Sequence, residues 1–474
     1  MRYCLADLVA INKLGDIMSI EPRWNRQATT LLLILIVAAL LRLSLLGSKS
    51  LWFDESFSVS FARLAPQQMW QPNAVRPETH PPLYYHGLHY WMSYFGESEF
   101  MVRLPSALIS LINVALIYIL GRRLGNHRTG ILAAALLALS PLNLWYAQEA
   151  RMYVFMTTIL LLSAILLTWD SWLAMPALVA VLAVGLYLDY TMLPLWLLLS
   201  AVWAVMWWHR GHRLRPLLIW LVSSIAAWLF FLPWLANFYD VLDTFSTVHL
   251  FIRLQEAVGL PFLRPWQYLL VMIAGSLCLI PVLAVLAELQ QRESSRTWVF
   301  TAVLLSFAAA TILFPIPRLF GVKRILVQFW PLIIVWVAWI LDQMGGRRSW
   351  PTRGLLAISL AASLITLLAV PKDDWRSAVK YINENKEVGE AALIDPFYNA
   401  TVTGYYDLDL PREKLEANSI QEPDVTGFWI IAERFPNQEI PTSPTEQMLD
   451  EQLELVEAVP FYRLEVRRYN AKAQ

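Results

Sequence analysis

Charged residues are scarce in this sequence: Asp, Glu, Lys and Arg make up 16% of its 474 residues, against about 25% in ordinary soluble domains. Cysteine is rarer still, with only Cys4 and Cys278, so the sequence excludes a disulfide framework and a cysteine-based zinc site as organising features. The formal net charge is zero, because 37 basic residues balance 37 acidic ones. That balance indicates neither a nucleic acid nor an acidic macromolecule as a partner.

Long apolar runs take the place of charge, since 57% of the residues are hydrophobic. A helix that crosses about 30 Å of hydrocarbon needs roughly 20 apolar residues. Eleven runs approach that length: 28–46, 102–121, 129–147, 152–169, 173–189, 191–208, 216–235, 267–287, 298–314, 325–341 and 354–370. The sequence therefore predicts an α-helical polytopic membrane protein with about eleven transmembrane helices over residues 28–370, in contact with a lipid bilayer.

The loops that join these runs differ in positive charge. Arginines gather in alternate connections: Arg23 and Arg26; Arg122, Arg123 and Arg128; Arg210, Arg213 and Arg215; Arg292 and Arg296; and Arg347, Arg348 and Arg353. Only the turn 170–172 on that side lacks one. By the positive-inside rule, we expect a cytoplasmic N-terminal segment (1–27) in the plasma (inner) membrane and an extracytoplasmic chain after Val370. No small-residue cleavage site follows the first run, which we expect to be retained.

Three stretches on the outer side are too long or too polar to be simple turns. Segments 47–101 and 236–266 mix aromatic and polar residues at helical spacing, which predicts short helices lying in the membrane interface. From residue 371 charges become frequent, and we expect a small extracytoplasmic α/β domain over 371–474. Its predicted elements are helices at about 374–385 and 444–456 and the strands "EAALID", "GFWIIAE" and "FYRLEVRRY".

Asp54 and Glu55, in "LWFDES", follow the first apolar run directly. A carboxylate beside an apolar wall can act as a general base towards an alcohol or can bind a metal ion. Neighbouring helical residues point in different directions, so one acid can face a cavity while the protein holds the other. The alternative is the N-terminus of an interfacial helix, where acidic side chains favour the helix dipole.

A second polar cluster lies in "ETHPPLYYHGLHYW". Pro81 and Pro82 end one helix and suit the start of the next, which places Glu78 and His80 just before a rigid bend. These two side chains could ligate a divalent ion or position a phosphate, with Tyr84 on the aromatic face that follows. Amphipathic packing at the bilayer interface is the alternative for the histidine.

Two further clusters add cations at the outer boundary. "YAQEARMYVF" places Glu149, Arg151 and Tyr153 at the end of the third run, where charges must pair or line a wet pocket. "FPIPRLFGVKRILV" places Lys323 and Arg324 outside, against the positive-inside trend. Arginine suits forked contacts with phosphate oxygens, whereas a structural Glu–Arg clamp and snorkelling membrane anchors are the alternatives.

Together the clusters predict a cavity at the outer leaflet that takes a lipid-linked phosphate from the bilayer and a hydroxyl acceptor. No phosphate-cradling Gly-rich loop is present, so a nucleotide cofactor is not expected. The runner-up is a transporter or flippase of lipid-linked sugars, which favours charged or broken helices near the membrane midplane. A membrane scaffold whose outer domain binds partners would leave the polar clusters unexplained.

The order and spacing of "LWFDESFSVSFARL", "THPPLYYHGLHYWMSYFGESEF" and "LSPLNLWYAQEARMYVF" resemble the bacterial glycosyltransferase family 39. These GT-C-class enzymes are related to protein O-mannosyltransferases and to the aminoarabinose transferase of lipid A. The resemblance is strongest over 28–160 and implies an inverting hexosyl or pentosyl transferase of the cell envelope. Its donor would be a polyprenyl-phosphate sugar, and its acceptor the hydroxyl of a lipid, glycan or protein.

The resemblance also implies roles for individual residues. Asp54 matches the acidic position proposed as general base, and Glu55 completes the "DE" pair of the mannosyltransferase branch. Arg151 would contact the donor phosphate or act as a structural partner, and Arg324 would be a phosphate ligand. Thr79 and His80 separate Glu78 from the double proline, where the lipid A enzyme has a lysine. A divalent metal, Zn²⁺ or Mg²⁺/Mn²⁺, stays open as a cofactor, with Glu78, His80 and His249 as candidate ligands.

Overall fold

The structure is a computed structural model, which describes residues 21–71, 80–169, 173–192, 195–196, 199–200, 214–238, 322–343, 350–395, 399–414, 426–433 and 451–471. The chain divides into two compact units. The first comprises Met1–Ser44, Ala107–Ala147 and Tyr153–Leu364, and the second comprises Leu45–Ser106, Gln148–Met152 and Ile365–Gln474. Each unit is therefore assembled from segments that are far apart in the sequence.

Helices occupy most of the predicted apolar runs. They are α2 (Glu21–Leu43), α6 (Glu99–Leu124), α7 (His127–Ala138), α8 (Pro141–Ala147), α9 (Tyr153–Leu167), α10 (Ala174–Leu188), α12 (Leu214–Phe231), α18 (Val322–Gln343) and α19 (Trp350–Ala369). Among the described residues, three helices are long and apolar enough to cross a membrane, or four if a bent pair forms one span. The runs 267–287 and 298–314 and most of 191–208 lie outside the described residues.

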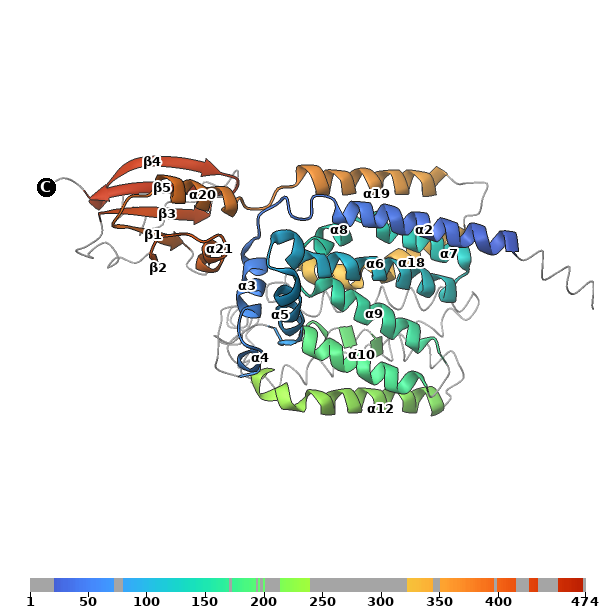
Figure 1. Ribbon diagram of the computed structural model, residues 1–474. Helices are drawn as coiled ribbons and strands as arrows, with labels where there is room; N and C mark the ends of the chain where they lie inside the picture. The colour runs from blue at the N-terminus through green and yellow to red at the C-terminus, as the bar shows by residue number, and fades with distance from the viewer. Residues whose placement is uncertain are drawn as a thin grey trace, which may run out of the picture. The chain divides into compact units, whose positions relative to one another are not determined.

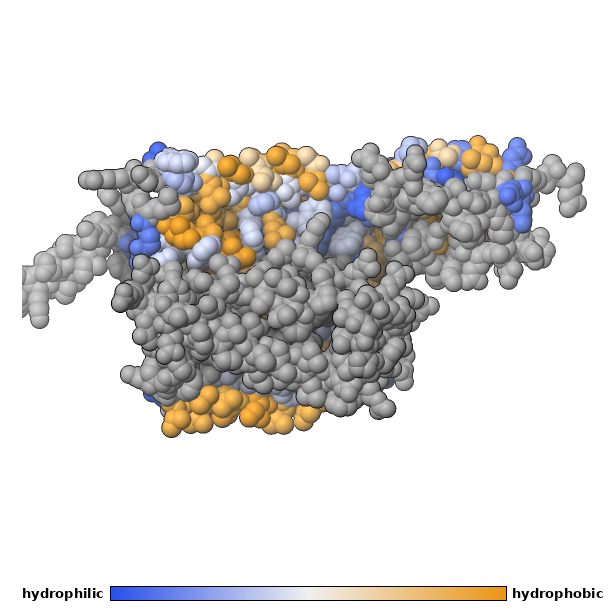
Figure 2. Space-filling model, turned by 180° about the vertical axis from the view of Figure 1, so that it is seen from behind, coloured by the Kyte–Doolittle hydropathy of each residue, from blue (hydrophilic) through white to orange (hydrophobic). Residues whose placement is uncertain are grey.

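Apolar side chains are exposed along several of these helices. On α12 they include Leu218, Ile225 and Leu229, which are 46%, 60% and 60% exposed. Figure 2 shows this hydrophobic surface as an orange band at its lower edge. Water would penalise such a band, whereas lipid would not. The surface therefore fits a helical membrane protein, as the composition predicts.

The predicted span 129–147 is not one straight helix. It consists of α7 and α8, which are bent by 59° at the break between Ala138 and Pro141. The break has a local cause, because Pro141 cannot donate a backbone hydrogen bond and disfavours helical geometry in the residue before it. α8 then leads into residues 148–152, which carry the "QEAR" motif.

The backbone carbonyls at this break are bonded by side chains from distant helices. Arg42 of α2 is fully buried and donates to the carbonyls of Leu137 (3.2 Å) and Ala138 (3.0 Å). Ser363 of α19 donates to the next carbonyl, Leu139, at 2.7 Å. A buried arginine inside an apolar helix is thereby compensated, and the interrupted helix keeps its hydrogen bonds.

Replacing Arg42 with methionine is expected to destabilise the protein, because two buried carbonyls lose their donor at about 1–3 kcal/mol each. Denaturant unfolding in detergent micelles would measure the loss. Arg128→Met is the matched control, since Arg128 is 48% exposed and lies 3.5 Å from Asp342, so it should change stability by about 1 kcal/mol or less. Equal effects of the two substitutions would contradict the capping role of Arg42.

The second unit begins with three short helices in the predicted interfacial segment. They are α3 (Phe53–Ala62), α4 (Pro66–Met69) and α5 (Leu83–Phe95). Pro82 occupies the N-cap position of α5, so the tandem prolines start a helix as predicted. α3 and α5 lie side by side (Figure 1) and are joined by edge-to-face aromatic contacts, including Phe61 and Tyr85 at 4.8 Å between centroids.

The C-terminal part folds as a five-stranded sheet of order β2-β1-β3-β5-β4. The strands are β1 (Glu390–Asp395), β2 (Arg412–Lys414), β3 (Gly427–Glu433), β4 (Leu453–Phe461) and β5 (Leu464–Ala471). β1 pairs in parallel with β2 and β3, whereas β5 pairs antiparallel with β3 and β4. α20 (Trp375–Asn385) and the short α21 (Ala400–Tyr405) lie beside the sheet (Figure 1).

One core of this domain forms between α20 and the sheet. Trp375 and Ile382 of α20 pack with Trp429 of β3 and Val466 of β5, all fully buried. Residues of β3 alternate between this cluster and a second one on the opposite side of the sheet, which includes Phe428. This alternation is the two-residue period of a strand, and it confirms the predicted strands 390–395 and 427–433 and the predicted helix 374–385.

Two predictions for this domain are wrong. Residues 453–456, predicted to end a helix, begin β4 instead, because "LELVEAVPF" pairs as an edge strand. Residues 444–450 of that predicted helix lie outside the described residues. The predicted strand "FYRLEVRRY" is the end of one strand, a turn and the start of the next: β4 ends at Phe461 and β5 begins at Leu464. Arg463 in the turn has a φ of 59°, a conformation that tight hairpin turns require.

Candidate active site

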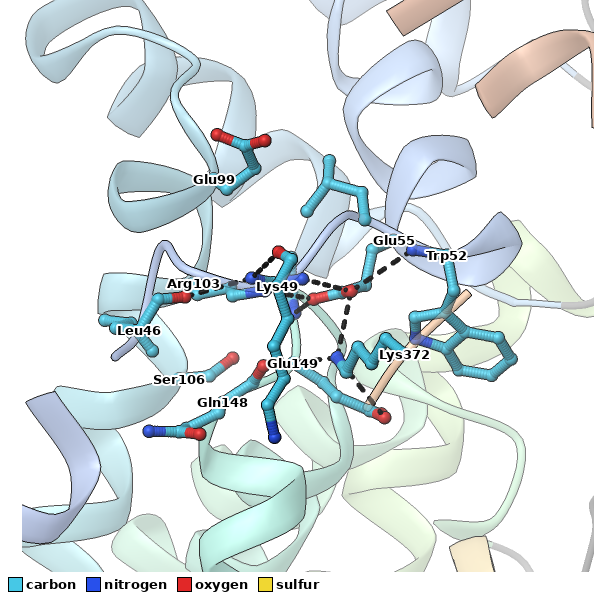
Figure 3. Close-up of polar contacts among 12 residues, drawn as sticks. Leu46, Lys49, Trp52, Glu55, Glu99, Arg103, Ser106, Gln148, Glu149 and Lys372 are labelled. Carbon is cyan, nitrogen blue, oxygen red and sulfur yellow. Dashed lines mark hydrogen bonds and ion pairs between the residues drawn. The ribbon is translucent and has the colours of Figure 1, made fainter. Parts of the chain in front are cut away.

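Glu55 of α3 lies at the centre of a buried cluster of charges in the second unit. Its carboxylate accepts two hydrogen bonds from Arg103, from Nε at 2.7 Å and Nη2 at 2.8 Å, and one from Lys372 Nζ at 3.0 Å. The backbone N–H of Ala150 donates a further one at 3.0 Å. Figure 3 shows the carboxylate enclosed by these groups. Glu55 is 0% exposed, so every strong contact of its charge comes from the protein.

The charges around Glu55 control its protonation. Burial acts to raise the pKa of Glu55, but the positive charges of Arg103 and Lys372 and the hydrogen bonds from Arg103 and Ala150 outweigh it, so the pKa falls to about 2. Burial lowers the pKa of Lys372, and the negative charge of Glu55 opposes that effect. Glu55 is therefore a fixed anion and a poor proton acceptor at neutral pH.

This shift predicts a loss of stability in acid. The folded-state pKa of about 2 lies below the ordinary value of 4.5, so the stabilisation is fully present above about pH 4.5 and is lost as the pH falls towards 2. Unfolding free energies measured in micelles from pH 6 to pH 3 should decrease, and the decrease should be smaller in Glu55→Gln. An identical pH dependence in both proteins would contradict the ionised state of Glu55.

Asp54, the neighbouring acid, has a different environment. The whole residue is 9% exposed and so is largely buried, whereas Glu55 is 0% exposed. Its backbone carbonyl accepts hydrogen bonds from Ser58 Oγ (2.9 Å) and from Arg151 Nη1 (3.2 Å). The two adjacent acids thus differ as helical neighbours should, with Glu55 directed into the charged cluster and the backbone of Asp54 fastened by an arginine.

Arg151 joins the motifs that the sequence analysis singled out. Its Nη1 donates to Asp54 O and Ser58 Oγ, both at 3.2 Å, and its Nη2 lies 2.9 Å from Nε2 of His80. Because a guanidinium only donates, Nε2 of His80 must accept, which corresponds to the neutral ring with its proton on Nδ1. Tyr85 OH completes the set at 3.4 Å. The "DES", "HPP" and "QEAR" motifs therefore meet in one place.

Three further predicted site residues, Glu149, Tyr84 and Tyr153, are also described by the structure. Glu149 is buried, with Oε1 3.8 Å from Lys372 Nζ. Tyr84 of α5 is also buried, and burial raises the pKa of its hydroxyl well above the usual value. Tyr153 begins α9 in the first unit and packs edge-to-face on Tyr146, with 5.2 Å between ring centroids.

Four predicted residues cannot be placed in the site. Glu78 and His249 lie outside the described residues. Lys323 and Arg324 lie in the first turn of α18, but their side chains are outside the described set. Of the three candidate metal ligands, the structure thus describes only His80, whose Nε2 faces a guanidinium. Within the described residues no group of three His, Cys, Asp or Glu side chains could hold a metal, and we derive no step through one.

Sequence reasoning missed Arg103 and Lys372. Arg103 stands at the second position of the predicted run 102–121, and a charge so near the start of an apolar run was a usable signal. Lys372, in "PKDDW", is 317 residues from Glu55. It had no comparable signal, because a lysine just outside a membrane helix is an ordinary interfacial residue.

Comparisons with known proteins show what this chain resembles. Residues 79–236 match the family described as dolichyl-phosphate-mannose-protein mannosyltransferase. The undecaprenyl phosphate-α-4-amino-4-deoxy-L-arabinose arabinosyl transferase 1 of Pseudomonas fluorescens is 28% identical over 383 residues, which are 74% of this chain and 67% of the relative. The chain is thus similar to proteins that are named as sugar transferases using a lipid phosphate. The resemblance predicted from the three motifs is thereby confirmed.

Two solved structures of such transferases are also similar to the chain. ArnT from Cupriavidus metallidurans bound to undecaprenyl phosphate has 15% identity and a TM-score of 0.43, covering 92% of this chain and 97% of that one. The Archaeoglobus fulgidus oligosaccharyltransferase tethered with an acceptor peptide has 11% identity and a TM-score of 0.47, covering 86% and 69%.

Proposed function

We propose that the protein is an integral-membrane glycosyltransferase that moves a sugar from a polyprenyl-phosphate donor to a hydroxyl acceptor on the extracytoplasmic face. One observation supports the assignment of roles: the two adjacent acids lie in different environments. Glu55 is saturated by Arg103, Lys372 and Ala150 N–H, so it serves as an anchor. Asp54, at 9% exposure against 0% for Glu55, serves as the general base.

The proposed reaction is a single displacement. Asp54 accepts the proton of the acceptor hydroxyl while that oxygen attacks the anomeric carbon of the sugar. The bond between the anomeric carbon and the phosphate oxygen breaks, and the polyprenyl phosphate leaves with the electron pair. Attack from the face opposite the leaving group inverts the anomeric configuration. A positioned base of this kind contributes about 10²–10⁴-fold to the rate.

In this proposal Arg151 orients Asp54 and does not bind the donor. Its Nη1 is engaged by Asp54 O and Ser58 Oγ, and its Nη2 by His80. These contacts fix the first turn of α3, so Arg151 and His80 set the direction of Asp54. Lys323 and Arg324, at the start of α18, remain the proposed ligands of the donor phosphate, which a lysine and a forked guanidinium suit.

The proposed topology follows from the sequence. About eleven spans over 28–370 place residues 1–27 in the cytoplasm and the domain 371–474 outside, as the alternating arginines indicate. The 47–101 segment and the sheet domain then share the outer side, where lipid-linked sugars meet their acceptors. The matched family and the Pseudomonas relative are named for a dolichyl-phosphate-linked hexose and an undecaprenyl-phosphate-linked pentose, so both sugar classes are candidate donors.

A donor panel tests the function. The purified full-length protein in nanodiscs is incubated with polyprenyl phosphates that carry radiolabelled mannose or 4-amino-4-deoxy-L-arabinose, together with an envelope extract as acceptor. We expect transfer of label and release of lipid phosphate with one donor class. In proteoliposomes, movement of a fluorescent donor between leaflets without transfer would support the flippase instead. Neither transfer nor movement with any donor would overturn the proposal.

A further inference from the structure

We infer that Lys372 is a positioning residue through which the C-terminal domain holds the first turn of α3, and hence Asp54, in its working orientation. The inference deepens the proposed function and rests on it for the role of Asp54. Lys372 lies three residues beyond the end of α19 and three before the start of α20. It therefore stands at the junction that ties the sheet domain to the last membrane helix.

The lysine is built into the charged cluster. Its side chain is 5% exposed, and Nζ lies 3.0 Å from Glu55 Oε2, 3.4 Å from the carbonyl of Gln148 and 3.8 Å from Glu149 Oε1. A flexible lysine is rarely held so closely unless its charge is needed there, because burying an ammonium group is costly. Figure 3 shows Lys372 and Arg103 approaching the Glu55 carboxylate from different directions.

Charges in this cluster balance only when all of its members are present. Glu55 and Glu149 carry two negative charges, and Arg103 and Lys372 carry two positive ones. Removal of Lys372 leaves Glu55 with its Arg103 partner and takes from Glu149 a cation that lies 3.8 Å from its carboxylate. The cluster should then rearrange locally rather than unfold, and the residues it fixes should shift.

The same domain also holds the segment that leads into α3. Tyr406 OH accepts from the backbone N–H of Leu51 at 2.7 Å. Arg376 of α20 donates to the carbonyls of Gly47 (3.1 Å) and Ser48 (3.3 Å). Phe53, the first residue of α3, packs against the core between α20 and the sheet.

These contacts act together with those of two arginines near the start of α3. Arg103 donates to the carbonyls of Leu46, Lys49 and Ser50, and Arg151 donates to that of Asp54. The N-cap residue, Trp52, makes no side-chain capping bond, and the Glu55 carboxylate is 3.5 Å from its backbone N–H. Asp54 is the second residue of the helix. A displacement of the base by about 1 Å can cost about 10²-fold in rate, so loosening this turn should reduce the chemical step.

The first test compares Lys372→Met with Lys380→Met. Lys380 is in the same domain but is 72% exposed and pairs with Glu384 on the surface of α20. We expect Lys372→Met to lower kcat about tenfold while the KM for the donor and the affinity for undecaprenyl phosphate stay unchanged, and Lys372→Arg to restore most of the rate. Lys380→Met should match the wild type. Equal kcat in Lys372→Met and the wild type would overturn the inference.

A second pair covers the case in which Lys372→Met fails to fold. Tyr406→Phe removes only the hydroxyl that accepts from Leu51, whereas Tyr405→Phe removes one that donates to Glu97 O at 2.7 Å. Hydrogen exchange of the amides of residues 51–58 should be faster in Tyr406→Phe and unchanged in Tyr405→Phe. Equal exchange in both would overturn the inference.

The exchange measurement needs no substrate, so it separates the two proposals. If no donor supports transfer but exchange at 51–58 rises in Lys372→Met and Tyr406→Phe, the proposed function fails and the coupling stands as a structural one. If transfer occurs and neither variant changes kcat or exchange, the function stands and the positioning role of Lys372 is wrong.

Discussion

Replacement of Glu55 by glutamine is expected to destabilise the protein by about 3–5 kcal/mol, the usual cost of removing one partner from a buried ion pair. The substitution changes little in volume, but it leaves Arg103 and Lys372 buried with one negative charge, that of Glu149, to offset two positive ones. Denaturant unfolding in micelles, followed by tryptophan fluorescence, would measure the loss.

Two comparisons show whether the charge is responsible. Glu97→Gln removes an acid from an ion pair with Arg63 whose side chains are 44% and 40% exposed, and it should cost about 1 kcal/mol or less. The double variant Glu55→Gln/Lys372→Met removes one charge of each sign, and it should recover part of the stability lost in Glu55→Gln. A double variant less stable than Glu55→Gln would contradict the electrostatic explanation.

Replacement of Asp54 by asparagine is expected to lower the rate of sugar transfer by about 10²–10⁴-fold. Asparagine has nearly the same shape but cannot accept the acceptor's proton. Its backbone carbonyl keeps the hydrogen bonds from Ser58 and Arg151 in this variant, so the fold should be preserved. Single-turnover transfer from the preferred donor, with undecaprenyl phosphate binding measured alongside, separates chemistry from binding.

A control for this substitution lies in the sheet domain. Asp407 is exposed and has a φ of 53°, a conformation that asparagine tolerates well, so Asp407→Asn should leave both transfer and stability unchanged. An Asp54→Asn protein that transfers sugar at the wild-type rate would show that another group accepts the proton.

Much of the fold could be predicted because its causes are local. Apolar runs of membrane length give the helices of the first unit, and the short apolar runs "EAALID" and "GFWIIAE" give β1 and β3. The start of α5 followed from Pro81 and Pro82. β4 was missed because apolar and acidic residues do not alternate strictly in "LELVEAVPF", and its acidic residues also suit an exposed helix.

The break between α7 and α8 had a local signal that was overlooked. Ser140–Pro141 stands inside the run 129–147, and a proline there disfavours a continuous helix. The hydrogen bonds from Arg42 to the carbonyls at this break could not be predicted. The acceptors are 95 and 96 residues away, and no pattern in the sequence links them to Arg42.

The candidate site was likewise predictable only where its signals are local. Motif order suggested that Asp54, His80 and Arg151 belong together, and the structure brings them into contact through Arg151. The separation of roles within the acid pair could not be predicted, because it depends on Arg103 and on Lys372, which is 317 residues from Glu55. Contacts of that range arise from tertiary packing, which local periodicity does not encode.

The most direct test of the account compares Asp54→Asn with the charge-balanced double variant Glu55→Gln/Lys372→Met. Each is assayed in nanodiscs for single-turnover sugar transfer, with rates corrected to equal folded protein. Because Asp54 is intact in the double variant, we predict that it transfers sugar at least about tenfold faster than Asp54→Asn. Faster transfer by Asp54→Asn than by the double variant would contradict the assignment of Asp54 as base and Glu55 as anchor.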